Sequence, residues 1–321
     1  MATIAEQLTS LANTKTAIKQ AIVDKGVAVT DDTPFSGYAA KIGEISGGGG
    51  ATKYGLTIDA VLGDADANGA LQVPTGAYTL NFSGVVDLGA NALSETFNGS
   101  LGKVIQSIAF PDLTAVSGNK GLYSAFASCT AKTADFGALK TVGAQEGFSR
   151  VLQNTTSMET INFGSLVTIT GRQAFYFAFY GSYASNIDFS SLEDVSAQEA
   201  FNSAFQSCNN VVQMNFGALK TIGQKGFYSA LRDMKKLVSV NFDSLETVGS
   251  QAFSYCFFLT NSLKSISFPS LKNVQANSFS NAFYTGLEEI HFRADMQATI
   301  EACDGYSSKF GATNATIYFD L

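Results

Sequence analysis

One short pattern recurs along most of this chain. In the copy at residues 161–179, an apolar residue is followed by a Phe two positions later, then by a Leu, and then by two Ala-Phe steps four residues apart. Because successive copies lie 24 to 28 residues apart, each is one structural unit of a repeat protein. The Phe of the pattern occurs at Phe82, Phe110, Phe136, Phe163, Phe189, Phe216, Phe242, Phe268 and Phe292.

The residues of one repeat predict its local structure. Ile187, Asp188 and Phe189 alternate between apolar and polar, as in a short strand with one buried face. The two Ala-Phe steps have the spacing that places both on one face of a short helical turn. One unit cannot bury its own apolar face, so neighbouring units must stack. The sequence therefore predicts a repeat solenoid with a parallel β-sheet on one side and short helical turns on the other.

The chain divides into five predicted segments. Residues 1–46 form a small α-helical module for anchoring or oligomerisation, and residues 47–50 are four glycines that act as a hinge. Residues 51–80 alternate like strands and are expected to form a β-rich cap. The repeat pattern occupies residues 81–293. After it, residues 294–321 are expected to cap the exposed end of the stack.

The apolar residues of the first segment predict an amphipathic helix. They follow one another at intervals of 4, 3, 7 and 4 residues, close to a heptad repeat. An isolated helix of about five turns is marginal in water, so we expect this one to associate with partners or with further copies of the chain. The oligomerisation seam consists of Ile4, Leu8, Leu11, Ile18 and Ile22.

Composition and charge argue against several classes of function. The net charge is −7 and no basic stripe is visible, so a nucleic acid is not an expected partner. No apolar run approaches the roughly eighteen residues of a membrane span, and residues 1–11 lack the basic and apolar regions of a signal peptide. We therefore expect no membrane insertion. The four cysteines have no CxxC spacing and are expected to be buried.

Polar residues recur beside the apolar residue of each predicted strand. In five successive repeats this position is Asn or Asp, so a parallel sheet would carry a row of short polar side chains on its outer face. Amides and carboxylates can hydrogen-bond to sugar hydroxyls, which makes the row a candidate ligand-binding face. A solvated sheet face must also be polar, and the sequence leaves that alternative open. The row consists of Asp135, Asn162, Asp188, Asn215 and Asn241.

A second periodic position follows the first Phe or Leu of each predicted helical turn. It holds Tyr in alternate repeats, at Tyr123, Tyr176 and Tyr228. Rings in this position could stack on sugar rings or pack against neighbouring repeats or subunits. We expect them to be contact aromatics that pack between repeats or subunits.

One short segment matches the first half of a calcium-binding loop. Asp64, Asp66 and Asn68 supply oxygen atoms at the first, third and fifth positions, and Gly69 occupies the sixth. The twelfth position is Thr75, where such a loop needs Glu. Asn-Gly between two apolar runs is also a strong hairpin signal. We therefore expect a hairpin turn and no cofactor, with calcium as the alternative.

No catalytic constellation is recognisable in the sequence. The single histidine, His291, falls at an outward strand position, and the sequence indicates no nucleophile or carboxylate placed to work with it. There is no GxSxG motif and no phosphate-binding loop. We predict that the protein is not an enzyme.

Residues 80–292 resemble the BspA-like leucine-rich repeats, in which I-x-x-x-A-F and I-x-F-x-x-L blocks alternate. The likeness covers about two-thirds of the chain and extends through every repeat. That family is found on bacterial and protozoan surface proteins and in some phage proteins, mostly as adhesion or ligand-binding modules. The Pro usual after the strand is present here only at Pro111 and Pro269, with Gly, Ser or Asp elsewhere. We expect this departure to alter turns and not the architecture.

The first 46 residues resemble a different group, the amino-terminal segments of tailed-phage virion proteins. The likeness rests on residues 11–18, on Ile22, Lys25 and Gly26, and on residues 33–42. It implies a fibre or tail-tip protein on the exterior of a phage particle, held to other virion proteins through residues 1–46. Such fibres are commonly trimeric, so a homotrimer is the favoured oligomer.

The two resemblances together imply a host-recognition protein. A leucine-rich-repeat solenoid displayed on a virion would bind a host-surface glycan or protein. Two alternatives remain open. The chain could be a decoration or cementing protein that binds no receptor, or it could be a bacterial surface adhesin of the same repeat family.

Overall fold

The structure is a computed structural model that describes residues 19, 29, 78–98, 101–284 and 286–321. The chain divides into two units, residues 1–72 and residues 73–321. Apart from residues 19 and 29, the 1–46 module lies outside the described residues. The same is true of the hinge at 47–50 and of most of the 51–80 cap. The predicted residues that fall in these segments are Ile4, Leu8, Leu11, Ile18, Ile22, Asp64, Asp66 and Asn68.

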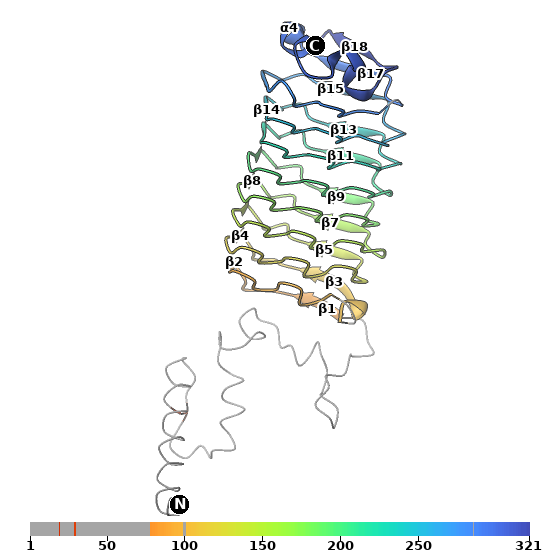
Figure 1. Cartoon of the computed structure of the whole chain (residues 1–321). Coiled ribbons are helices and arrows are strands. Elements are labelled where there is room, and N and C mark those ends of the chain that lie inside the picture. The colour runs from red at the N-terminus through yellow and green to blue at the C-terminus, as the bar shows by residue number, and fades with distance from the viewer. Residues whose placement is uncertain (1–18, 20–28, 30–77, 99–100, 285) are drawn as a thin grey trace, which may run out of the picture. The chain divides into compact units, whose positions relative to one another are not determined.

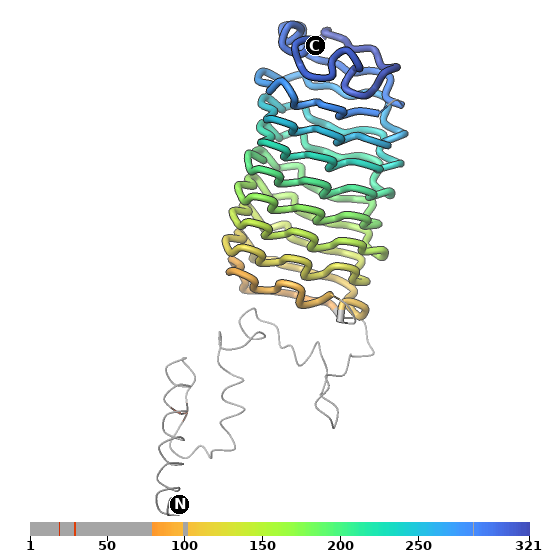
Figure 2. Tube along the Cα trace, viewed as in Figure 1, coloured from red at the N-terminus to blue at the C-terminus, as the bar shows by residue number. Residues whose placement is uncertain are grey.

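The described part of the second unit is a parallel β-solenoid, as predicted from the repeat (Figure 1). Its coils stack in sequence order, so each coil lies between the preceding and following repeats (Figure 2). Sheet 1 takes one strand from each coil, at the position predicted from the apolar alternation. Its strands are β1 (Tyr78–Asn81), β3 (Ile105–Ala109), β5 (Thr133–Asp135), β7 (Thr160–Asn162), β9 (Asn186–Asp188), β11 (Gln213–Asn215), β13 (Ser239–Asn241), β15 (Ser265–Phe268) and β17 (Glu289–Phe292).

A second parallel sheet runs beside the first. The sequence predicts only an inward turn of the chain at this place, because each strand is two residues long and shows no alternation. Sheet 2 is continuous over eight strands. They are β2 (Asp87–Leu88), β4 (Ala115–Val116), β6 (Thr141–Val142), β8 (Thr168–Ile169), β10 (Asp194–Val195), β12 (Thr221–Ile222), β14 (Thr247–Val248) and β16 (Asn273–Val274).

The third side of each coil, here called the turn face, differs from the predicted helical turns. It is a succession of tight turns in which about every fourth residue has a positive φ, such as Lys120, Ser124 and Ser128. Ala125 N donates to Leu122 O within the coil (3.1 Å), whereas Ser124 N donates to Ser149 O of the next coil (2.8 Å). About half of the amides on the turn face thus donate hydrogen bonds to the next coil. In a continuous helix these amides would instead donate to carbonyls of the same helix.

The core is a set of stacked Phe columns. The strand-side column runs from Phe82 to Phe292, and neighbouring rings such as Phe136 and Phe163 stack with centroids 4.9 Å apart. A turn-side column packs edge-on against it, as Phe148 does against Phe163 at 5.4 Å. Each Phe ring that is removed from water contributes roughly 2 to 3 kcal/mol. The repeated Phe residues therefore hold neighbouring coils together.

The last coil is followed by short elements that cover one end of the stack. They are η4 (Ala294–Met296), α4 (Gln297–Glu301), η5 (Tyr306–Gly311) and β18 (Thr316–Phe319). Met296, Ile300 and Phe310 are buried, and β18 pairs in parallel with β17. At the other end of the described stack, η3 (Leu101–Val104) precedes β3. None of the helices in the described residues is long and apolar enough to cross a bilayer.

Candidate functional site

Sheet 1 brings the predicted polar row together on its outer face. Asp135 lies opposite Asn162, and Asn162 lies opposite Asp188, in the register of β5, β7 and β9. Asn215 lies opposite Asn241 in the register of β11 and β13. The five side chains are half-buried or exposed. This set, Asp135, Asn162, Asp188, Asn215 and Asn241, is called the polar ladder below.

Every member of the polar ladder also has a structural task. Its side-chain oxygen accepts a hydrogen bond from the backbone N–H two residues later, at 2.8–3.0 Å in all five coils. This is an Asx turn, in which a short Asn or Asp side chain stabilises a tight turn of its own backbone. The turn explains why Asn and Asp recur where each strand ends. It leaves the second polar atom of each side chain available.

At β7 that second atom is used within the protein, on the same Asp135 oxygen that accepts in the Asx turn of β5. Asn162 Nδ2 donates to Asp135 Oδ1 at 2.8 Å. The fit leaves no room for a side chain at the turn position after the ladder residue: a Cβ added to Gly137 would lie 2.6 Å from Asn162 Nδ2, and one on Gly164 would lie 2.8 Å from Asp188 Oδ2. Glycine at this position therefore lets consecutive coils approach closely.

Sheet 1 is interrupted between β9 and β11, where Ser190 occupies the glycine position. Phe163 N donates to Asp188 O at 2.9 Å, but no hydrogen bond joins Phe189 N to Asn215 O. The sheet is interrupted again between β13 and β15, where the position holds Asp243. From the sequence, Gly, Ser or Asp in place of the usual Pro is expected to alter turns alone. That expectation is incomplete, because both interruptions of sheet 1 coincide with Ser or Asp at this position.

Two prolines hold the same position without interrupting the sheet. Pro111 comes two residues after Ala109, and β3 still pairs with β5. Pro269 comes two residues after Ser267, and β15 still pairs with β17. Neither turn is an Asx turn, because Pro has no N–H to donate. Ser83 also holds this position after Asn81, and β1 still pairs with β3, where the next coil presents the small Ala109. The steric rule thus applies to the coils from β5 onward that end in Asn or Asp.

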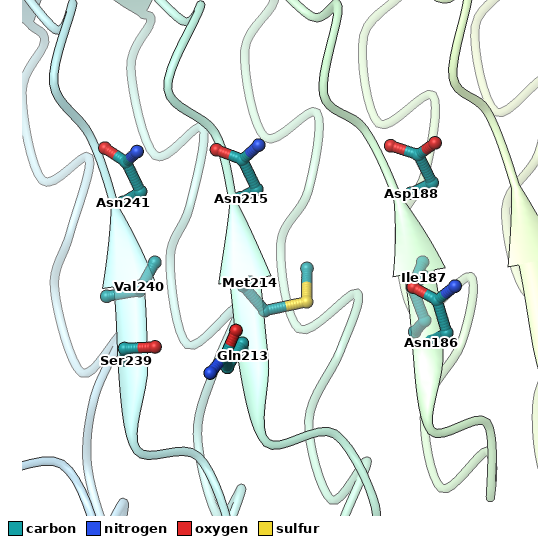
Figure 3. Close-up of a pocket in the computed structure, with 9 residues that line it drawn as sticks. All are labelled: Asn186, Ile187, Asp188, Gln213, Met214, Asn215, Ser239, Val240 and Asn241. Atoms are coloured by element: carbon teal, nitrogen blue, oxygen red, sulfur yellow. The ribbon is translucent and has the colours of Figure 1, made fainter.

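The first interruption opens a groove of about 320 Å³ across β9, β11 and β13. Its upper row is Asp188, Asn215 and Asn241, which Figure 3 shows side by side where the strands end. The remaining lining residues are Asn186, Gln213, Ser239, Ile187, Met214 and Val240. Asp188 Oδ2 and the Nδ2 atoms of Asn215 and Asn241 have no hydrogen-bond partner among the described residues, unlike Asn162 Nδ2. These atoms can therefore bind a ligand.

The residues just before the sheet 1 strands change character beside the groove. In four coils away from it they form ion pairs between coils, Lys132 with Glu159 at 3.3 Å and Lys264 with Glu288 at 2.9 Å. At β11 and β13 the same position holds Val212 and Val238, whose side chains are 44% and 53% exposed. The sequence analysis missed these valines, although the change from charged to apolar residues in one repeat position was visible there.

The three predicted contact tyrosines lie on the turn face, away from the polar ladder in the coil. Tyr176 packs edge-on against Phe177 with ring centroids 4.6 Å apart, and Tyr228 packs against Tyr255 at 5.7 Å. Lys120 Nζ lies 5.0 Å from the centroid of the Tyr123 ring. All three are half-buried and contact neighbours in the same or the adjacent coil.

His291 is not the isolated surface residue that the sequence indicates. Its Nδ1 lies 3.0 Å from Asp320 Oδ1, and its ring stacks on Tyr318 at 4.7 Å. Both partners come from β18 or the residue after it, which only the β17–β18 pairing brings alongside. No group of three or more His, Cys, Asp or Glu residues suited to a metal occurs in the described part of the chain.

The four cysteines are buried free thiols, as expected. Burial is the main cause that raises their pKa, to about 11 for Cys129 and to about 12 for Cys208. Cys208 Sγ donates to Phe179 O at 3.0 Å in the preceding coil. A thiol with so high a pKa is a poor nucleophile near neutral pH, so these residues act as small apolar side chains.

Comparison with known protein families supports the repeat assignment. The model of the BspA type leucine rich repeat region matches residues 125–260 and 176–305, with six copies. The two ranges together span residues 125–305, which is more than half of the 321 residues. A search of curated proteins finds no match.

Proposed function

Since the chain belongs to the BspA-type leucine-rich repeat family, we propose that it is a recognition protein that acts by binding and not by catalysis. The observation that carries this proposal is the polar ladder. It places amide and carboxylate groups on the solvent side of sheet 1, in register from β5 to β9 and from β11 to β13. In the groove, three of their polar atoms have no hydrogen-bond partner among the described residues. A rigid stack of coils can hold such groups in fixed positions for a partner.

We further propose that the setting is a tailed-phage particle. The support is the likeness of residues 1–46 to virion amino-terminal segments. In this setting residues 1–46 would attach the chain to the particle as a homo-oligomer, favoured as a trimer, and the solenoid would be displayed on the exterior. The partner would be a glycan or a protein on the surface of the host cell.

Binding to cells tests the recognition role. Fluorescently labelled full-length protein should bind to bacterial cells of the host strain, and unlabelled protein should compete for that binding. A double variant, Thr133→Arg with Gln213→Arg, adds bulky charges to the exposed face of sheet 1 and should reduce binding at least fivefold. Thr141→Arg on sheet 2 is the matched control and should bind like the natural protein. Equal binding by all three would refute recognition through sheet 1.

Purified particles test the setting. Mass spectrometry of particles from induced lysates should detect the chain, and a version that lacks residues 1–50 should be absent from them. Incorporation of the shortened chain would disprove attachment through the first segment. Absence of the full chain from particles would instead favour a bacterial surface adhesin.

A further inference from the structure

We infer that the groove across β9, β11 and β13 is a binding site for a neutral oligosaccharide. This inference rests on the proposed recognition function and assigns it a location and a ligand class. The groove has the volume of about 320 Å³ that is expected of a small-ligand site, roughly 300 to 1,000 Å³. It exists because sheet 1 opens between β9 and β11 while sheet 2 stays paired there through β10 and β12.

The available hydrogen-bonding groups suit hydroxyls. Asn215 Nδ2 and Asn241 Nδ2 are donors, and Asp188 Oδ2 is an acceptor. Each is held in place because the Oδ1 atom of the same side chain is fixed in an Asx turn. A sugar hydroxyl both donates and accepts, so a row that combines one acceptor with two donors can bind several hydroxyls of one saccharide. Fixed groups also lose little conformational entropy when a ligand binds.

Apolar surface lies at the opposite end of the groove, where β11 and β13 begin. Val212 and Val238 are exposed where four other coils present the charged residues of ion pairs, and half-buried Val240 belongs to the lining. A pyranose ring has C–H faces as well as hydroxyl edges, so it can cover apolar side chains while its hydroxyls bind amides. The two exposed valines lie in adjacent coils, where Val238 N donates to Val212 O, and give the start of the groove strands a small apolar surface.

Charge selects the ligand class. Among the nine lining residues the only ionisable side chain is Asp188, and the whole chain carries a net charge of −7. An anionic saccharide would be repelled by this carboxylate and would find no basic partner in the groove. An extended peptide would need an open strand edge with room for a further strand beside it, whereas β9 and β11 remain in contact with each other across the interruption. A neutral saccharide is not repelled by Asp188 and needs no strand edge.

An array of immobilised oligosaccharides tests the inference with the full-length chain. The array should hold neutral glycans and acidic glycans that carry sialic acid, uronic acid or sulfate. We expect binding to neutral glycans alone, and calorimetry with the strongest neutral oligosaccharide gives the affinity. Asn215→Asp keeps the oxygen of the Asx turn but removes the amide donor, so it should weaken that affinity about tenfold. Val238→Ser removes exposed apolar surface beside the groove and should weaken the affinity severalfold. The fold should tolerate this change, because Ser185 occupies the same position before β9.

Two matched variants separate binding from folding. Asn202→Asp makes the same chemical change on the turn face, and Val86→Ser removes a valine that is 60% exposed in the first coil. Both should bind the neutral oligosaccharide like the natural protein, and all four variants should unfold at similar temperatures. Binding of acidic glycans alone, or unchanged affinity in Asn215→Asp and Val238→Ser, would overturn the inference. If the chain binds host cells but no glycan on the array, the inference is overturned and the recognition function stands. If it binds neither cells nor glycans, the recognition function itself is refuted.

Discussion

The ring centroids of Phe189 and Phe216 lie 6.3 Å apart, whereas those of Phe163 and Phe189 lie 4.9 Å apart. The wider step falls at the coil where sheet 1 is interrupted. The next widest step, 5.9 Å between Phe242 and Phe268, falls at the second interruption. The opening at the surface is therefore matched by a wider spacing in the strand-side Phe column, whereas sheet 2 stays paired at the same coils.

Replacement of Ser190 by glycine should close the interruption. Without a side chain at this position, Asn215 can approach Asp188 as Asn162 approaches Asp135, and Phe189 N can donate to Asn215 O. We expect the Phe189 amide to exchange with deuterium at least tenfold more slowly, because a hydrogen-bonded amide is protected. Hydrogen-exchange NMR or mass spectrometry measures this.

The reverse change provides the control. Gly164→Ser should open the sheet between β7 and β9 and make the Phe163 amide exchange faster, since the new Cβ would lie 2.8 Å from Asp188 Oδ2. If neither substitution changes exchange in its own coil, the side chain at this position does not determine the coil spacing.

Glycine is required at a second place for a different reason. A Cβ on Gly171 would lie 2.0 Å from the backbone O of Ala144 in the preceding coil, and a backbone atom cannot rotate away as a side chain can. Gly171→Ala should therefore lower the free energy of unfolding by about 3 kcal/mol. Gly143→Ala is the control, because its Cβ would meet only Thr170 Oγ1 at 3.8 Å. Urea unfolding measures both, and equal stability of the two variants would contradict the close approach of coils.

The sequence predicts sheet 1 because its strands carry a readable signal. Residues such as Ile187 and Phe189 point inward on either side of Asp188, and this alternation repeats with a constant period. Sheet 2 gives no such signal, since Thr141 and Val142 form a strand of only two residues. The stacking of coils, and not local alternation, makes these pairs into strands.

The turn face shows why spacing alone can mislead. Ala174-Phe175 and Ala178-Phe179 lie four residues apart, which fits a helical turn. The same spacing fits a series of four-residue turns with a left-handed residue in each, such as Gln173 and Phe177. The hydrogen bonds to the next coil decide between the two, and these involve residues about 25 positions away, such as Phe175 N to Ala200 O at 2.8 Å.

The polar ladder was predictable, but the groove within it was not. Asn and Asp recur at one position of the repeat, so their row could be read from the sequence. Ser190 differs visibly from Gly137, Gly164 and Gly217, yet its effect depends on where the side chain of the next coil lies. That position follows from the stacking geometry, which a single sequence does not contain.

Thiol reactivity should follow the burial of the cysteines. Cys129, Cys208 and Cys256 are almost fully buried, and Cys303 is buried beside Asp304, with its pKa raised mainly by burial. In the native protein at pH 8, Ellman's reagent should react with none of the four thiols within an hour, and in 6 M guanidinium with all four, because the thiolate is the reactive form. Stoichiometric reaction of the native protein would contradict the stacked core.

The stability should also depend on alkaline pH through these thiols. Cys208 has its pKa raised by burial from about 9 to about 12, so between these values the unfolded chain has lost a proton that the folded chain keeps. Its contribution to stability is fully present below pH 9 and falls by about 1.4 kcal/mol per pH unit as the pH rises toward 12. Cys208→Ala removes this dependence. The variant should be less stable than the natural protein at pH 8, and the difference should shrink by pH 10.5 in urea unfolding. Ala204→Gly, which destabilises a buried site without a titrating group, should show the same difference at both pH values, and a constant difference for Cys208→Ala would refute the linkage.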